Sequence, residues 1–120
     1  MIDAIQAITG FDATNNYPAA FASRYTAGDF NGTHNDINHF SAVAFVLNMT
    51  KYWLPCWGGN LVILDEDFDN IIEAYTPKFN TMIIFDVPIP HAVLPVSIYS
   101  QSERLAVSGW YLNLKKEPKQ

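Results

Sequence analysis

The chain has 120 residues, 49% of them hydrophobic and 16% charged, which excludes intrinsic disorder and favours one globular domain. Its formal net charge of −5 argues against nucleic-acid binding, and its longest apolar run, Ala42 to Leu47, is too short to span a membrane. Because no basic and apolar leader pattern opens the chain, we expect no signal peptide. The single cysteine, Cys56, favours a reducing, cytoplasmic compartment.

The first part of the chain predicts a short helix followed by a loop. Apolar side chains at positions 2, 4, 5, 7 and 8 favour a helix over Ile2 to Ile8. Turn-forming polar residues then predict a loop from Phe11 to Pro18. From Tyr25 onward, short β-like runs alternate with turn residues. These runs predict strands over Ser41–Asn48, Leu61–Leu64, Phe79–Val87, Ala92–Ser97 and Leu105–Leu114.

The acidic segment from Asp65 to Tyr75 is predicted to be a solvated connection with a helical turn over Ile71–Ala74. Prolines interrupt the strand-rich part of the chain at positions 55, 77, 88, 90 and 95. Because proline lacks the N–H that a central strand donates, these positions predict strand starts, edges or bulges. We therefore expect a small all-β sandwich or jelly roll with a short N-terminal helix, in a single domain over residues 1–120.

One short motif places a histidine and a carboxylate two residues apart. If His34-Asn35-Asp36 is extended, residues 34 and 36 point to the same face and can reach one metal ion; the alternative is a loop cap or a surface histidine. His91 would complete a set of two histidines and one carboxylate, which leaves three positions of an octahedral ion open, as in non-haem Fe(II) oxygenases. Its alternative is a core or edge histidine. His39 has no carboxylate at matching spacing and is predicted to lie at the surface.

Arg104 is the third chemically informative residue. If the loop Ile98 to Glu103 joins two neighbouring strands, Arg104 lies on the strand next to that of His91. A five-carbon diacid could then bind a metal at one end and the guanidinium fork at the other. The alternative is an ordinary surface arginine, although an arginine buried among the apolar residues that follow it would need a partner.

The order of these motifs resembles the Fe(II)- and 2-oxoglutarate-dependent dioxygenases, specifically their prolyl 4-hydroxylase-like branch. The resemblance implies a double-stranded β-helix, that is, a jelly roll. It is collinear from about Tyr25 to Asn113 and runs through Tyr25-Thr-Ala-Gly-Asp-Phe, His34-Asn-Asp36, Leu47-Asn48, Gly58-Gly59-Asn-Leu61, Pro77-Lys-Phe79-Asn80, Ile84-Phe85, His91-Ala-Val93 and Arg104-Leu-Ala-Val-Ser-Gly-Trp110-Tyr111.

The resemblance also implies roles for individual residues. His34, Asp36 and His91 match the iron ligands, and Arg104 matches the residue that pairs with the distal carboxylate of 2-oxoglutarate. Tyr25 and Ser108 match hydroxyl positions that assist binding of this cosubstrate. The implied cofactors are Fe(II), with 2-oxoglutarate as cosubstrate and O₂, and ascorbate is a candidate reductant.

The activity implied by the resemblance is hydroxylation of a prolyl residue in a peptide or protein, or of a proline-like amino acid, with succinate and CO₂ as co-products. A jelly-roll binding module of the cupin type, which holds a metal or small ligand without turnover, is the alternative. We expect neither nucleic acid nor a membrane as a partner. Cys56 is predicted to be a packing or loop residue without a catalytic role, since no basic neighbour is recognisable.

Three features depart from the branch or stay open. Val46 stands where the branch often has a tyrosine, so one hydrogen bond to the cosubstrate is missing. The short stretch before Tyr25 predicts a minimal or N-terminally truncated version, with exposed sheet surface that a partner, such as a second copy, covers. The aromatic residues Tyr52, Trp53 and Trp57 either line a substrate mouth or pack against the sandwich.

Overall fold

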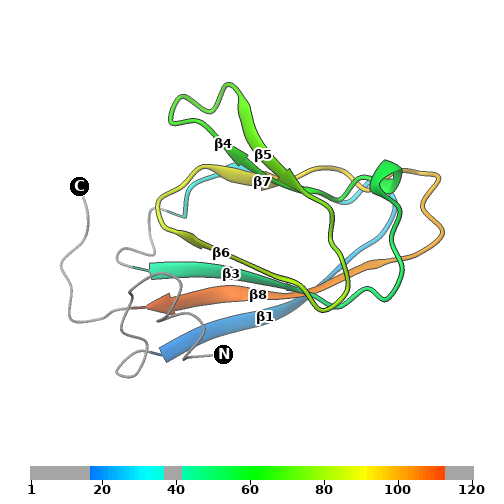
Figure 1. Cartoon of the computed structure of the whole chain (residues 1–120), viewed down its shortest axis with the longest axis horizontal. Coiled ribbons are helices and arrows are strands. Elements are labelled where there is room, and N and C mark those ends of the chain that lie inside the picture. The colour runs from blue at the N-terminus through cyan, green and yellow to red at the C-terminus, as the bar shows by residue number, and fades with distance from the viewer. Residues whose placement is uncertain (1–16, 37–41, 113–120) are drawn as a thin grey trace.

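The computed structural model describes residues 17–36 and 42–112, which form two antiparallel four-stranded sheets that face each other (Figure 1). The strand order is β1-β8-β3-β6 in the first sheet and β2-β7-β4-β5 in the second. The helix predicted over residues 2–8 lies outside the described residues. The elements are β1 Tyr17–Tyr25, β2 Asn31–His34, β3 Ala42–Asn48, the 3₁₀ turn η1 Pro55–Trp57, β4 Leu61–Leu64, β5 Ile71–Tyr75, β6 Met82–Asp86, β7 His91–Val93 and β8 Arg104–Leu112.

Successive strands alternate between the two sheets, except that β4 and β5 form a hairpin within the second sheet. This winding is a double-stranded β-helix, so the predicted all-β jelly roll is confirmed. It brings side chains from strands far apart in the sequence into one interior. Within the two described ranges, no helix has the length and apolar character needed to cross a membrane.

Three segments differ from the sequence prediction. Residues 17–24, which the prediction left as loop or unassigned, belong to β1, and Asn31–His34 forms β2 outside the predicted strands. Ile71–Ala74 lies in β5 rather than in a helical turn. The sequence of β1 is rich in alanine, which has little intrinsic β preference, but all nine of its residues pair with β8. β5 pairs with β4 in the same way. Tertiary pairing therefore stabilises β1 despite its alanines, whereas β5 also contains Ile71, Ile72 and Tyr75, which favour strands.

Two predicted strands are shorter in the structure. The strand predicted from Phe79 begins only at Met82, because residues 78–81 form a turn in which Asn80 has a φ of 60°. The strand predicted over Ala92–Ser97 ends at Val93, two residues before Pro95. Beyond it, Val96 forms an isolated bridge with Gly58, accepts a backbone hydrogen bond from Gly28 and donates one to the Asp29 carbonyl. These turns close the ends of the sandwich.

The first sheet buries apolar side chains on both faces. On the face toward the second sheet, Val46 and Ala106 pack with Leu61 and Val93. Val43, Phe45 and Tyr111 form a second cluster on the opposite face. Because successive residues of β8 point to opposite faces, positions 104, 106, 108 and 110 all face the interior between the sheets.

Candidate functional site

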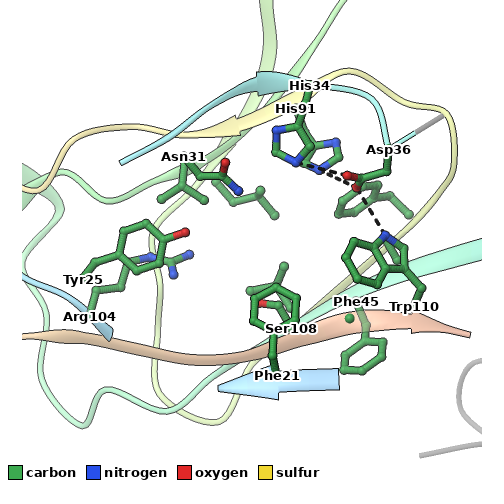
Figure 2. A pocket seen from close by; sticks show the side chains of 16 residues that line it. Phe21, Tyr25, Asn31, His34, Asp36, Phe45, His91, Arg104, Ser108 and Trp110 are labelled. Carbon is green, nitrogen blue, oxygen red and sulfur yellow. Dashed lines mark hydrogen bonds and ion pairs between the residues drawn. The ribbon is translucent and has the colours of Figure 1, made fainter. Parts of the chain in front are cut away.

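Two histidines lie side by side at one end of the interior. His34 is the last residue of β2, and His91, the first residue of β7, is its partner in the antiparallel pairing. The ring centroids are 4.2 Å apart. Asp36 lies two positions after His34 in the chain. Its backbone has a φ of 56°, and its carboxylate points toward both rings (Figure 2). The two side chains thus meet as the spacing suggested, but without an extended chain at residue 36, because Asp36 adopts a left-handed conformation that aspartate tolerates better than most residues.

The three side chains converge on one point. His34 Nε2 lies 3.3 Å from Asp36 Oδ1, and His91 Nε2 lies 3.1 Å from Asp36 Oδ2. One ligand atom from each residue can be chosen such that all lie within 4.8 Å of one another. His34 Nδ1 donates a hydrogen bond to the Gly32 carbonyl (2.6 Å), and His91 Nδ1 donates one to the Ile89 carbonyl (2.7 Å). Since a carbonyl only accepts, Nδ1 of each ring carries a proton, so a ring in its neutral, metal-binding form has its lone pair on Nε2.

This donor set fits a ferrous ion. Three electron-pair donors around one point repel one another unless a cation lies between them. Two imidazole nitrogens and one carboxylate oxygen form the facial set that suits Fe(II) with open coordination positions. The bonds from Nδ1 to the backbone carbonyls orient the rings as outer partners of metal ligands usually do. The structure thus brings His34, Asp36 and His91 together, and their role as ligands remains a prediction.

Asp36 is held in its ionised form. Burial raises the pKa of this carboxyl. In the metal-free protein with protonated rings, however, the hydrogen bond and charge of His91, the charge of His34 and a hydrogen bond from Trp110 together hold the pKa below its ordinary value. Trp110 Nε1 donates to Asp36 Oδ2 at 3.3 Å. On the other side, the ring of Phe85 meets the His91 ring edge-on at 4.7 Å. An ionised, oriented carboxylate is what a divalent cation requires here.

Arg104 lies at the opposite end of the same pocket (Figure 2). It is 1% exposed, its Nε donates to the Gly59 carbonyl at 2.7 Å, and its guanidinium carbon lies 5.1 Å from the centre of the Tyr25 ring. Burial lowers the pKa of Arg104, yet a guanidinium keeps its charge at neutral pH. Among residues 17–36 and 42–112 it has no carboxylate partner. A buried cation without a counter-charge calls for an anionic ligand.

The predicted placement of Arg104 requires a correction. It does not lie on a strand next to that of His91, because β8 belongs to the first sheet and β7 to the second. The connection over residues 94–103 crosses between the sheets, and a sequence cannot distinguish such a crossing from a hairpin by loop length alone. Arg104 therefore faces the histidines across the interior, and a diacid between them would span the two sheets.

The pocket has a volume of about 230 Å³. This is below the range of roughly 300–1,000 Å³ typical of drug-sized ligands, so the pocket suits a small molecule. Ser108 lies between the two charged ends, and Tyr25 stands beside Arg104 (Figure 2). Val46 pairs with Ser108 on the neighbouring strand and also lines the pocket. This is the position at which the prolyl 4-hydroxylase-like branch often has a tyrosine.

Sequence reasoning assigned no role to several residues at this site. Trp110 belongs to one of the motifs that carry the resemblance, but its hydrogen bond to Asp36 joins residues 74 positions apart, so the sequence did not indicate it. Its spacing of six from Arg104 was the available signal, since it places both on one face of a strand. Asn31 and Phe21 also line the pocket, and no sequence pattern marked them. His39 lies outside the described residues.

The aromatic loop packs instead of lining the pocket. Trp57 is buried and meets Tyr52 and Trp53 edge-on, at centroid distances of 5.7 and 5.4 Å. Trp53 Nε1 donates to the Gly58 carbonyl at 2.9 Å. None of these three side chains borders the pocket. The packing interpretation is favoured for Trp57 and Trp53, whereas Tyr52 is 64% exposed. Cys56 is exposed in η1, in agreement with a loop position.

Comparison with solved structures shows how widely this architecture recurs. A prolyl-4-hydroxylase from Pseudomonas putida is 26% identical, with a TM-score of 0.64 over 78% of this chain and 51% of that one. A 2OG-Fe(II) oxygenase family oxidoreductase from Burkholderia pseudomallei has a TM-score of 0.74 at 17% identity, over 92% of this chain and 49% of that one. A Trichoplax adhaerens prolyl hydroxylase in complex with a hypoxia inducible factor peptide fragment has a TM-score of 0.58 at 17% identity, over 87% of this chain and 51% of that one. The chain thus spans about half the length of these proteins.

Sequence comparison identifies the family. The search of curated proteins gave no significant match. The family model of the 2OG-Fe(II) oxygenase superfamily, in contrast, matches residues 20–112, which include both histidines, Asp36 and Arg104. This match covers most of the chain and agrees with the jelly-roll fold and the donor set. The chain therefore belongs to the 2OG-Fe(II) oxygenase superfamily.

Proposed function

We propose that the protein is an Fe(II)- and 2-oxoglutarate-dependent dioxygenase that hydroxylates a prolyl residue or a proline-like amino acid. The observation that carries this proposal is the pairing of two chemically different ends in one small pocket. One end is a donor set for a divalent metal, and the other is a buried arginine that no carboxylate of the described residues neutralises. A diacid such as 2-oxoglutarate satisfies both ends at once.

Each residue has a defined task in this proposal. His34, Asp36 and His91 hold Fe(II), which when bound supplies the oxidative chemistry that converts 2-oxoglutarate and O₂ into succinate and CO₂ and hydroxylates the substrate. Arg104 binds the distal carboxylate of 2-oxoglutarate through its planar fork. The hydroxyl groups of Tyr25 and Ser108 supply further hydrogen bonds along the pocket. The apolar walls formed by Val46, Leu61 and Val93 limit the water around these charges.

The substrate part of the proposal is supported by the relatives and by the shape of the pocket wall. Two of the similar solved structures described above are prolyl hydroxylases, one of them with a peptide bound. Phe21 is 51% exposed and its ring lies 5.9 Å from that of Trp110, which contacts Asp36. Flat apolar rings beside the metal end suit the ring of a prolyl side chain. A second copy that covers exposed sheet surface remains a prediction, as does the cytoplasmic location.

The cupin-type binding module is the second candidate, and turnover separates it from the enzyme. Purified protein with Fe(II), ascorbate, 2-oxoglutarate and a proline-containing peptide library should form succinate, measured by mass spectrometry. Asp36→Ala should abolish succinate formation. Asp86→Ala, which removes an exposed carboxylate of β6 outside the pocket, is the matched control and should retain it. Metal binding without succinate formation in the parent protein would favour the binding module.

A further inference from the structure

Thr50 has an unusual set of contacts for a residue that follows the end of a strand. The ladder between β3 and β8 ends where Asn48 pairs with Ala106. Two residues later, the Thr50 hydroxyl donates to the Glu103 carbonyl at 3.0 Å and accepts from the Leu105 N–H at 2.6 Å. These are the backbone groups on either side of Arg104. Thr50 is 3% exposed, so water has little access to replace either bond.

The hydroxyl is one of the groups that hold the start of β8. Arg104 is the first residue of β8 and follows the long connection from β7. On one side its backbone pairs with Tyr25 of β1. On the other side, beyond the end of β3, the Met49 N–H donates to the Leu105 carbonyl at 2.9 Å and the Thr50 hydroxyl supplies the two bonds that flank Arg104. Strand ends fray unless such bonds retain them. Contacts on both sides therefore set the position of the Arg104 backbone: β1 on one side and the residues after β3 on the other. The backbone position in turn sets how far the guanidinium reaches into the pocket.

We infer that Thr50 is a positioning residue for Arg104, and that its hydroxyl tunes the affinity of the site for a dicarboxylate. This inference rests on the proposed function for the identity of the ligand, but not for the geometry. Thr50 does not border the pocket. It acts through the backbone on either side of the arginine that does.

The first experiment examines the arginine without any ligand. The chain has two arginines, Arg24 and Arg104, so the side-chain Nε–H region of an ¹H–¹⁵N spectrum holds two signals, and the signal absent from Arg104→Met is that of Arg104. In the parent, its exchange with water should be slow because Nε–H is buried against the Gly59 carbonyl. Thr50→Val keeps the shape and removes the hydroxyl, so exchange should accelerate. Thr50→Ser should restore slow exchange.

The second experiment measures 2-oxoglutarate affinity with Mn(II) in place of Fe(II). Thr50→Val should weaken binding by about tenfold, on the scale of one to two lost hydrogen bonds, while Mn(II) affinity stays at the parent value. In an Arg104→Met background the same change should have no further effect, because the residue through which Thr50 acts is gone. A general loss of stability would lower affinity in both backgrounds. Ser23→Ala is the matched control, since the Ser23 hydroxyl also bonds a β8 carbonyl, that of Ala106, but does not flank Arg104.

The outcomes separate this inference from the proposed function. Unchanged Arg104 Nε–H exchange in Thr50→Val overturns the positioning role, whatever the ligand. If the parent binds Mn(II) but not 2-oxoglutarate, the proposed function fails, and the exchange measurement alone decides the role of Thr50. If Thr50→Val does not fold, Thr50→Ala provides room for a bridging water and should show the same changes in smaller measure. Parent-like exchange and affinity in a folded Thr50→Ala would then count against the inference.

Discussion

Replacing Arg104 by methionine separates the binding of the cosubstrate from the binding of the metal. Methionine keeps the apolar stem of the side chain and removes the guanidinium. In the metal-free protein the loss of the bond to Gly59 is offset by removal of a buried charge that has no carboxylate partner within the described ranges. We therefore expect the free energy of unfolding of Arg104→Met to stay within about 1 kcal/mol of the parent value.

The ligand-dependent stability should respond quite differently. With Mn(II) present, 2-oxoglutarate at a hundred times its Kd should stabilise the parent by about 2.7 kcal/mol. For a domain of this size that corresponds to a rise in Tm of roughly 10 °C. Truncating one partner of a sheltered charge pair costs about 2–5 kcal/mol, which weakens the ligand by about thirtyfold or more. At the same ligand concentration the stabilisation of Arg104→Met should then fall below about 0.9 kcal/mol.

Thermal unfolding with and without 2-oxoglutarate measures this difference. Arg24→Met is the matched control, because it removes the other arginine of the chain, which is exposed and paired with Glu103. It should retain the full ligand-dependent rise in Tm. If Arg104→Met also retains the full rise, the distal carboxylate binds elsewhere and the reasoning from the buried charge is refuted.

Four further predictions follow from individual contacts. In the metal-free protein the lowered pKa of Asp36 stabilises the fold at pH values above 3.8, the pKa of this group in the unfolded chain. This stability is lost as the pH falls through the pKa of the folded state. Acid unfolding of Asp36→Asn should lack this part of the loss. Trp110→Phe removes the donor to Asp36 and should weaken Mn(II) binding by about tenfold, measured by titration; unchanged affinity would show that this bond does not orient the carboxylate. In Gly59→Ala an added Cβ would lie 3.0 Å from Arg104 Cδ at a φ of 64°, so the variant should lose about 1 kcal/mol or more of stability in denaturant unfolding, whereas a parent-like value would contradict the close approach. Cys56→Ser should form succinate at the parent rate because Cys56 is exposed and lies outside the pocket; loss of activity with the fold and metal site intact would overturn this.

The metal end of the site could be predicted from the sequence. His34 and Asp36 are two residues apart, which suggested a pair of ligands, and the order of motifs that resembles the dioxygenase branch grouped His91 with them. The conformation of Asp36 was not predictable in this way, because aspartate adopts both extended and left-handed backbone states. The structure shows the second.

The other end of the site depends on pairing between distant strands. Nothing in the sequence of residues 94–103 indicates that the chain crosses to the other sheet, and this crossing decides which residues Arg104 faces. The alanine-rich strand β1 was missed for the same reason, since its pairing with β8 and not its alanines stabilises it. The strand β5 was missed although Ile71, Ile72 and Tyr75 favour strands, because the acidic residues before it indicated a solvated connection. Thr50 carried no pattern at all, because its role depends on two backbone groups more than fifty residues away.

Turnover under ¹⁸O₂ tests the central claim most directly. The protein is supplied with Fe(II), 2-oxoglutarate and the proline-containing peptide library, and both co-products are examined by mass spectrometry. A dioxygenase of the proposed kind places one ¹⁸O atom in succinate and the other in a hydroxyl group of the peptide, in equal amounts, and Asp36→Ala forms neither product. Absence of labelled succinate from a parent protein that binds Fe(II) and 2-oxoglutarate would contradict the proposed activity.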